Sequence, residues 1–182
     1  MQRSMSAFFG RVDRALERLY DICGAIAAFF MVLLGAFVLA SILTRMFGIY
    51  VAGLTAYSGY AMASASFLAL AYTFRAGAHI RVALLRSRLS GRPLFWLELW
   101  CLSVGAFLTC FLAYYLVRMT WVSWLFKDRS EGADATPLWL PQTGVAIGSV
   151  VMAVCMVHAL VRTVATGEIQ SATGGDEQLL AD

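Results

Sequence analysis

Long apolar runs separated by one arginine-rich segment constrain this chain more than any other feature. Residues 49–74 contain no charged side chain, and residues 94–117 contain only Glu98. Between them, residues 75–93 (RAGAHIRVALLRSRLSGRP) carry five arginines and one histidine. A helix needs roughly 20 apolar residues to cross the hydrocarbon core of a bilayer, so each run is long enough. With 60% hydrophobic and 14% charged residues, the chain is predicted to be an integral membrane protein.

Four apolar runs predict an all-α fold with four transmembrane helices in a single membrane domain, residues 1–165. The expected spans cover about residues 22–44, 51–74, 94–124 and 141–161. The first two spans are joined by a very short connection, which makes them an antiparallel hairpin. Two prolines in ATPLWLP, residues 135–141, disfavour helix, so an extended segment is expected there. The polar residues 166–182 are expected to form a disordered cytosolic tail.

Two amphipathic segments accompany these spans. In residues 1–20, apolar side chains recur at helical spacing, and four arginines lie mostly on the other side of the helix, namely Arg3, Arg11, Arg14 and Arg18. This pattern predicts a helix that lies flat at the cytoplasmic membrane surface. Within residues 80–89, apolar positions three and four apart predict a second, short interfacial helix in the central loop.

The distribution of basic residues predicts the orientation. Short arginine-rich loops stay on the cytoplasmic side, which places the central loop and both termini there. Ten of the 14 Lys and Arg residues then lie inside. The net charge of +3 arises from residues at the ends of spans. The sequence lacks a basic stretch with interleaved aromatic residues, so no nucleic-acid partner is predicted.

Small side chains form stripes that favour close packing of helices. Ala61, Ala65 and Ala69 form a stripe in the second span, Gly105 belongs to one in the third span, and Gly144 and Gly148 have GxxxG spacing in the fourth. Together with polar and aromatic residues near the membrane surfaces, they yield seven candidate lipid or partner contacts: Arg81, Arg86, Glu98, Gly105, Trp139, Gly144 and Gly148.

No pattern of catalytic, cofactor-binding, metal-binding or substrate-binding residues emerges, and no enzymatic activity is predicted. Glu98 is the sole acidic residue within a span; we expect it to pair with an arginine of the basic segment, the alternatives being a contact with a partner subunit or a proton relay. A further hypothesis that stays open is that His79 and His158 act as a pair of axial haem ligands. The four cysteines lie in apolar runs without CxxC spacing and are expected to be packing residues. Such a chain is expected to be an accessory subunit.

Three stretches resemble the small permease subunit, DctQ type, of tripartite ATP-independent periplasmic (TRAP) transporters. They are ILTRMFG at residues 42–48, FRAGAHIRVALLRSRLSGRP at 74–93, and ATPLWLPQTGVAIGSVV at 135–151. The chain departs from many members of that family because its second span contains no acidic residue.

The resemblance implies the small scaffold subunit of a secondary importer in the bacterial inner membrane. Such an importer is driven by an ion gradient, usually sodium, and takes up organic acids. A large permease subunit holds the substrate and sodium sites, a periplasmic binding protein delivers the substrate, and no cofactor is implied. Two other functions stay open from the residues: a haem or quinone membrane anchor of a respiratory enzyme, and a small stand-alone exporter.

The predicted orientation can be tested by labelling intact cells with a membrane-impermeant thiol reagent. In a cysteine-free background, Ser130→Cys should be labelled from outside, and Ser87→Cys should be labelled only after the membrane is opened. The prediction rests on the retention of clustered arginines in the cytoplasm, and labelling of Ser87→Cys in intact cells would contradict it by showing that the central loop lies outside.

Overall fold

The computed structural model describes residues 2–49, 51, 53–75, 92–130 and 135–166. These residues form four helices and no strand: α1 (Gln2–Met46), α2 (Leu54–Arg75), α4 (Arg92–Phe126) and α5 (Trp139–Thr166). The all-α prediction is therefore confirmed for this part of the chain. The second interfacial helix, expected within residues 80–89, lies outside the described residues, as does the tail from residue 167.

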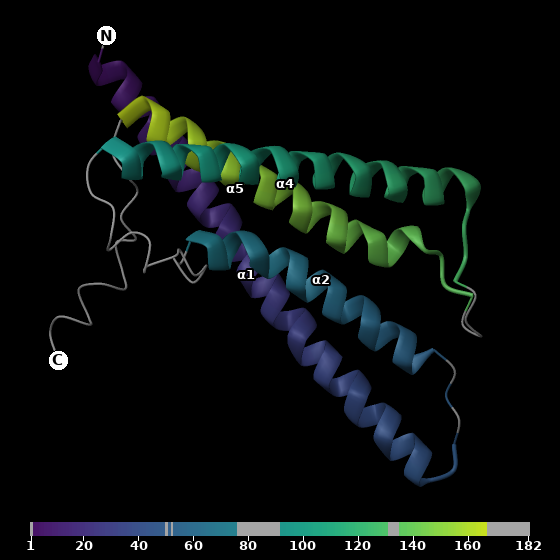
Figure 1. The fold of residues 1–182 in the computed structure, drawn as a ribbon. Coiled ribbons are helices and arrows are strands. Elements are labelled where there is room, and N and C mark those ends of the chain that lie inside the picture. The colour runs from purple at the N-terminus through teal and green to yellow at the C-terminus, as the bar shows by residue number, and fades with distance from the viewer. Residues whose placement is uncertain (1, 50, 52, 76–91, 131–134, 167–182) are drawn as a thin grey trace, which may run out of the picture.

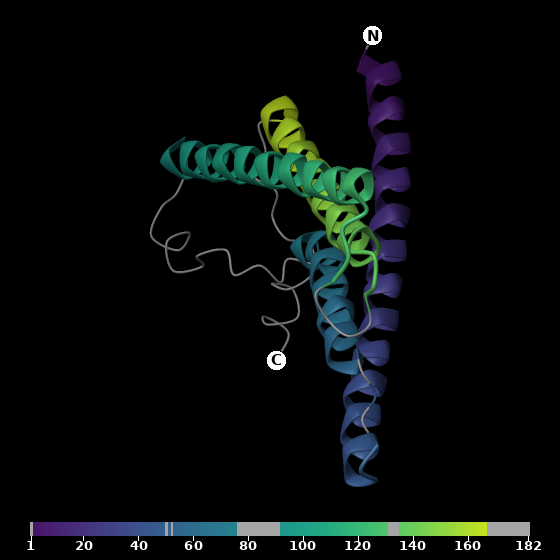
Figure 2. The ribbon, with the colours of Figure 1, turned by 90° about the vertical axis from the view of Figure 1, so that its right-hand side faces the viewer.

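The helices form two hairpins, α1 with α2 and α4 with α5 (Figure 1). The two hairpins meet mainly where α5 packs on α2, and α1 has only a small contact with α5. Figure 2 shows α4 running across the direction of α1. Helices α2 and α5 therefore occupy the centre, and α1 and α4 lie on opposite outer sides.

The N-terminal region differs from the prediction, because a separate helix over residues 1–20 does not occur. Helix α1 continues without a break from Gln2 to Met46. Residues 1–20 and the following apolar run are both compatible with helix, and no proline separates them. At about 1.5 Å per residue, its 45 residues extend about 68 Å, roughly twice the hydrocarbon thickness of a bilayer.

Helix α5 begins earlier than predicted. An extended segment was expected up to Pro141, but the helix already starts at Trp139. Pro141 falls in the first turn, where its missing N–H would have no partner within the helix in any case. The proline signal thus marks the beginning of the helix, and only the residues before Trp139 lie outside it.

Three helical segments are long and apolar enough to cross a membrane: Arg14–Met46, Pro93–Phe126 and Trp139–Ala165. The second expected span falls on helix α2, which has 22 residues but does not qualify, because it is less apolar than the three segments just named. The reason is its content of hydroxyl-bearing side chains: Thr55, Tyr57, Ser58, Tyr60, Ser64, Ser66, Tyr72 and Thr73.

The core depends on the absence of side chains at two glycines of α5. A Cβ atom on Gly148 would lie 2.5 Å from the carbonyl carbon of Phe67 and 2.8 Å from the amide nitrogen of Leu68. A Cβ atom on Gly144 would overlap the side chain of Ser64. The predicted GxxxG spacing therefore brings the backbones of α5 and α2 into close contact, as small residues do in membrane helices.

Around this contact, side chains from three helices form one apolar cluster. Helix α1 contributes Tyr20, Cys23 and Ala27, and the other members come from α2 and α5: Leu68, Ala71, Val151, Met152 and Cys155. All eight are buried. The cluster fixes the middle of α1 against the central pair of helices.

We predict that Gly148→Ala destabilises the protein and that Gly35→Ala does not. The added methyl at position 148 meets backbone atoms of α2, which cannot rotate away as a side chain can, so α5 must shift at a cost of about 1–3 kcal/mol. Gly35 has no atom within 4 Å of its Cβ position, and alanine there favours the helix by about 1 kcal/mol. Thermal unfolding in detergent, followed by circular dichroism, measures both; equal midpoints for the two variants would contradict the packing.

Candidate lipid and partner contacts

Those predicted contact residues that the structure describes do not form a single site. Gly144 and Gly148 lie between α5 and α2, inside the chain's own packing. Gly105 of α4 faces α5, and a Cβ atom there would lie 3.6 Å from both Cε and Sδ of Met156. That is an ordinary van der Waals distance, so alanine fits at position 105, whereas leucine would have to displace Met156.

The other predicted contacts lie at helix ends or outside the described residues. Glu98 is half-buried in the second turn of α4, and Trp139 is half-buried at the first position of α5. Arg81 and Arg86 fall outside the residues that the structure describes. The pairing of Glu98 with an arginine of the basic segment therefore stays a prediction.

The loop between α4 and α5 is anchored to the start of α2, which sequence reasoning missed. Within the loop, the amide of Ser130 donates to the carbonyl of Thr136 over 2.9 Å. Two tyrosines of α2 reach this loop: the hydroxyl of Tyr60 donates to Oγ of Ser130 over 3.2 Å, and the hydroxyl of Tyr57 lies 2.9 Å from Oγ1 of Thr136. These partners are more than 60 residues apart in the chain, so no local spacing could have predicted them.

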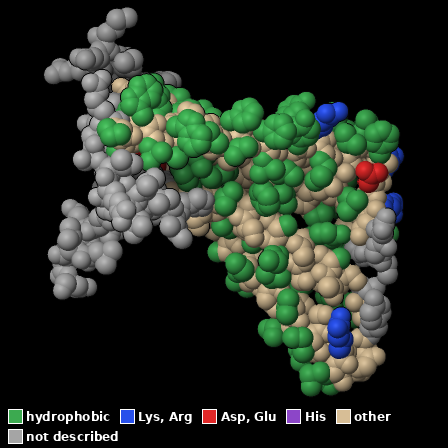
Figure 3. All heavy atoms as spheres, in the orientation of Figure 1, with side chains coloured by type: hydrophobic (Ala, Val, Ile, Leu, Met, Phe, Trp, Pro, Cys, Tyr) green, Lys and Arg blue, Asp and Glu red, His purple; other side chains and the backbone are tan. Residues whose placement is uncertain are grey.

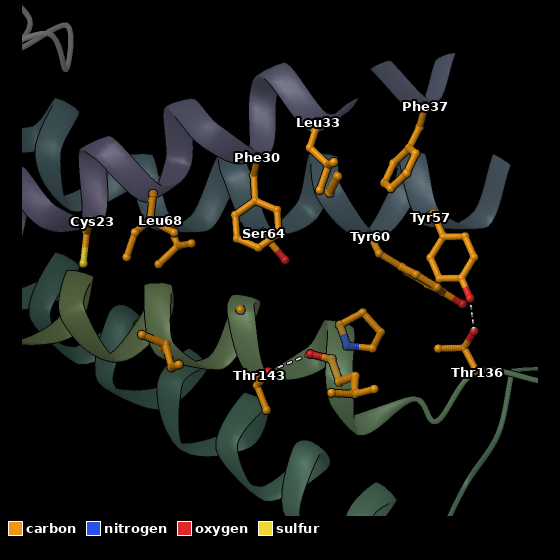
Figure 4. A pocket seen from close by; sticks show the side chains of 16 residues that line it. Cys23, Phe30, Leu33, Phe37, Tyr57, Tyr60, Ser64, Leu68, Thr136 and Thr143 are labelled. Atoms are coloured by element: carbon orange, nitrogen blue, oxygen red, sulfur yellow. Dashed lines mark hydrogen bonds between the residues drawn. The ribbon is translucent and has the colours of Figure 1, made fainter. Parts of the chain in front are cut away.

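Next to this anchor, an open cleft of about 460 Å³ lies between α1, α2 and the start of α5 (Figure 4). Phe30, Leu33 and Phe37 project into it from α1, and the ring of Tyr60 lies across it from α2. Its described lining is aliphatic and aromatic with a few hydroxyl groups, and it contains no Asp, Glu, Lys, Arg or His. Such a lining suits a hydrocarbon chain better than an organic acid, which needs cationic or N–H donors.

The histidines and cysteines form no recognisable centre within the described residues. His158 is half-buried on α5, and His79 lies outside the described part of the chain. Cys23 and Cys155 are buried, Cys101 and Cys110 are exposed, and all four are free thiols. The two buried cysteines belong to the apolar cluster of the core, where they act as small packing residues.

Fold and contacts together define an all-helical membrane protein whose interior is made of small-residue helix packing. The family model described as "Tripartite ATP-independent periplasmic transporters, DctQ component" matches residues 34–166. The match covers more than half of the chain, from the middle of α1 to the end of α5. The chain therefore belongs to the DctQ family of TRAP transporter small permease subunits. Comparisons with curated proteins and with solved structures found no match.

Family membership confirms the resemblance found in the sequence, whose three quoted stretches all fall within the matched residues. The family is a component of a transport system and not a family of enzymes. Transport in a membrane is thereby the broad function of the chain.

We predict that the double substitution Tyr57→Phe with Tyr60→Phe loosens the loop between α4 and α5. The two hydrogen bonds together contribute about 1 kcal/mol to the stability of the closed loop. Removing them should therefore raise the rate of tryptic cleavage after Lys127 or Arg129 about fivefold. The fragments can be identified by mass spectrometry of the detergent-solubilised protein. Tyr115→Phe on the exposed side of α4 is the matched control; equal rates for the control and the double variant would show that the tyrosines do not hold the loop.

Proposed function

We propose that this chain is the small scaffold subunit of an ion-gradient-driven importer of organic acids. In this assignment it pairs with a large permease subunit and receives substrate from a periplasmic binding protein, with sodium as the coupling ion. The match of the DctQ family model to residues 34–166 carries the proposal.

The chemistry of the interior supports a scaffold role. The contacts that join the two hairpins are made by small and apolar side chains, with hydroxyl groups at Tyr57, Tyr60 and Ser64, and the described cleft offers hydrocarbon and hydroxyl groups. Binding a carboxylate and a sodium ion inside a membrane requires cationic or N–H donors for the one and several oxygen ligands for the other. We therefore assign substrate and ion binding to the large subunit.

We further propose that α2 is the fourth transmembrane helix. Several of its hydroxyl groups donate to carbonyls of the same helix: Ser58 to Thr55 over 2.7 Å, Ser66 to Met62 over 2.9 Å, and Thr73 to Leu70 over 3.0 Å. These internal bonds reduce the cost of placing hydroxyls in hydrocarbon. Four spans place both termini on one side of the membrane, which we take to be the cytoplasm of a bacterial cell, beside the inner membrane.

The anchoring of this scaffold is assigned to residues near the membrane surfaces. We propose that Arg81 and Arg86 contact lipid headgroups or the large subunit, because an arginine combines an apolar stem with a guanidinium that binds phosphate or carboxylate as a fork. Glu98 and Trp139 are proposed to support the same contacts from α4 and α5.

The test is reconstitution of the complete transporter in vesicles. Uptake of the organic acid that the binding protein binds should require this chain, the large subunit, the binding protein and an inward sodium gradient. Vesicles that lack only this chain should take up substrate at least tenfold more slowly, because the moving subunit lacks its fixed support. Undiminished uptake without this chain, or uptake by this chain alone, would contradict the proposal.

A further inference from the structure

The open cleft between α1, α2 and the start of α5 is bounded by segments that can span a membrane. The α1 side chains that line it lie within residues 23–37, and those of α5 within residues 140–147. Both stretches belong to helical segments long and apolar enough to cross a bilayer. Ile26 and Ile147, which line the cleft from these two helices, are 41% and 55% exposed. The cleft therefore opens sideways towards lipid. Hydrophobic side chains also cover much of the surface seen in Figure 3.

The two ends of the cleft differ in polarity. The hydroxyls of Tyr57 and Thr136 lie at the end next to the loop between α4 and α5, and Cys23 and Leu68 lie at the opposite end (Figure 4). The step from Tyr57 to Leu68 is about 16 Å along α2, which is close to half of the hydrocarbon thickness of about 30 Å. Trp139, a residue type enriched at membrane surfaces, begins α5 near the polar end. The cleft thus runs from a membrane surface to about the middle of the bilayer.

Water is a poor occupant of this space. A buried water needs two to four polar partners, but hydroxyl groups along the cleft are already engaged. Those of Tyr57 and Tyr60 bind the loop between α4 and α5, and Oγ1 of Thr143 donates to the carbonyl of Leu140 over 2.6 Å. Most of the described lining is aliphatic or aromatic, so the cleft favours hydrocarbon.

A helix of another protein is too wide for the cleft. With its side chains, a helix of about 10 Å diameter and about 16 Å length fills on the order of 1,200 Å³, whereas the cleft has a volume of about 460 Å³. Its sides also touch at two places. The Tyr57 hydroxyl lies 2.9 Å from Oγ1 of Thr136, and Gly144 leaves no room for a Cβ atom beside Ser64. The cleft therefore accepts a chain narrower than a helix.

We propose that one acyl chain of a phospholipid lies in this cleft. Its polar ester end lies beside Tyr57 and Thr136, and its methyl end lies beside Cys23 and Leu68. An acyl chain is narrow hydrocarbon with a polar group at one end, and in a bilayer it extends from the surface to about the midplane, so its shape, length and polarity match those of the cleft. In the orientation predicted from the basic residues, the lipid belongs to the outer leaflet.

The bound chain fills the space where the two hairpins diverge and acts as a structural ligand. Apolar burial alone favours such a site little, because the bilayer is equally apolar. Van der Waals contact with several helices at once holds the acyl chain, so it should remain bound when detergent replaces the surrounding lipid. The inference does not depend on the proposed transport function, since it uses only the cleft and the apolar spans that line it.

Filling the cleft tests the site. Leu33 projects into it from α1, whereas the neighbouring Val32 is 74% exposed and is not part of the lining. The full chain, purified in mild detergent from membranes containing palmitoyl-oleoyl phosphatidylethanolamine, should retain one phospholipid in native mass spectrometry. Leu33→Trp should lower this occupancy at least fivefold, and Val32→Trp should leave it unchanged. Equal occupancy in the two variants, or an unsubstituted chain without phospholipid, would overturn the proposal.

Photo-cross-linking identifies the occupant with a substitution that nearly preserves side-chain shape. A p-benzoylphenylalanine replaces either Phe30, which projects into the cleft, or Phe29, which is 64% exposed outside it. After the complete transporter is purified in the same detergent, irradiation should attach phospholipid to position 30 at least fivefold more efficiently than to position 29. An adduct of position 30 with the large subunit, with a second copy of this chain or with detergent alone would show that a phospholipid is not the occupant.

Discussion

The close approach of α5 to α2 is the contact on which the rest of this structure depends. Each hairpin is held together along its own length, but the two hairpins meet chiefly between these central helices. Membrane helices gain little from the hydrophobic effect when they associate, because lipid tails are as apolar as their side chains. Close van der Waals contact must therefore supply the attraction, and Gly144 and Gly148 provide it by letting α5 reach the backbone of α2.

This central contact determines which surfaces are left for other molecules. Because α2 and α5 cover each other, most large side chains of α1 and α4 point outwards, among them Phe29 and Val32 on α1 and Phe107 and Trp121 on α4. A chain of 182 residues thereby presents a wide apolar surface with little interior. Such a shape suits a subunit that extends the membrane-embedded area of a larger assembly.

Much of the fold could be predicted from local patterns, and the failures have identifiable physical reasons. The apolar runs placed α2, α4 and α5 to within a few residues, and the GxxxG spacing marked the contact at Gly148. The break expected near residue 20 was wrong, because a change from amphipathic to apolar surface does not end a helix when both segments have helical spacing. The contact of Tyr60 with Ser130 had no local signal.

The hydroxyl-rich composition of α2 has a consequence for how the protein is made. Insertion of a single helix from the translocon into lipid depends on its own apolar character. Helix α2, which we propose as the fourth transmembrane helix, lacks the long apolar segment that each of the other three helices contains. It follows α1 after only the short segment 47–53, so the two can leave the translocon as a preformed hairpin. In that order of events α1 supplies the apolar surface, and α2 enters the bilayer already shielded on one side.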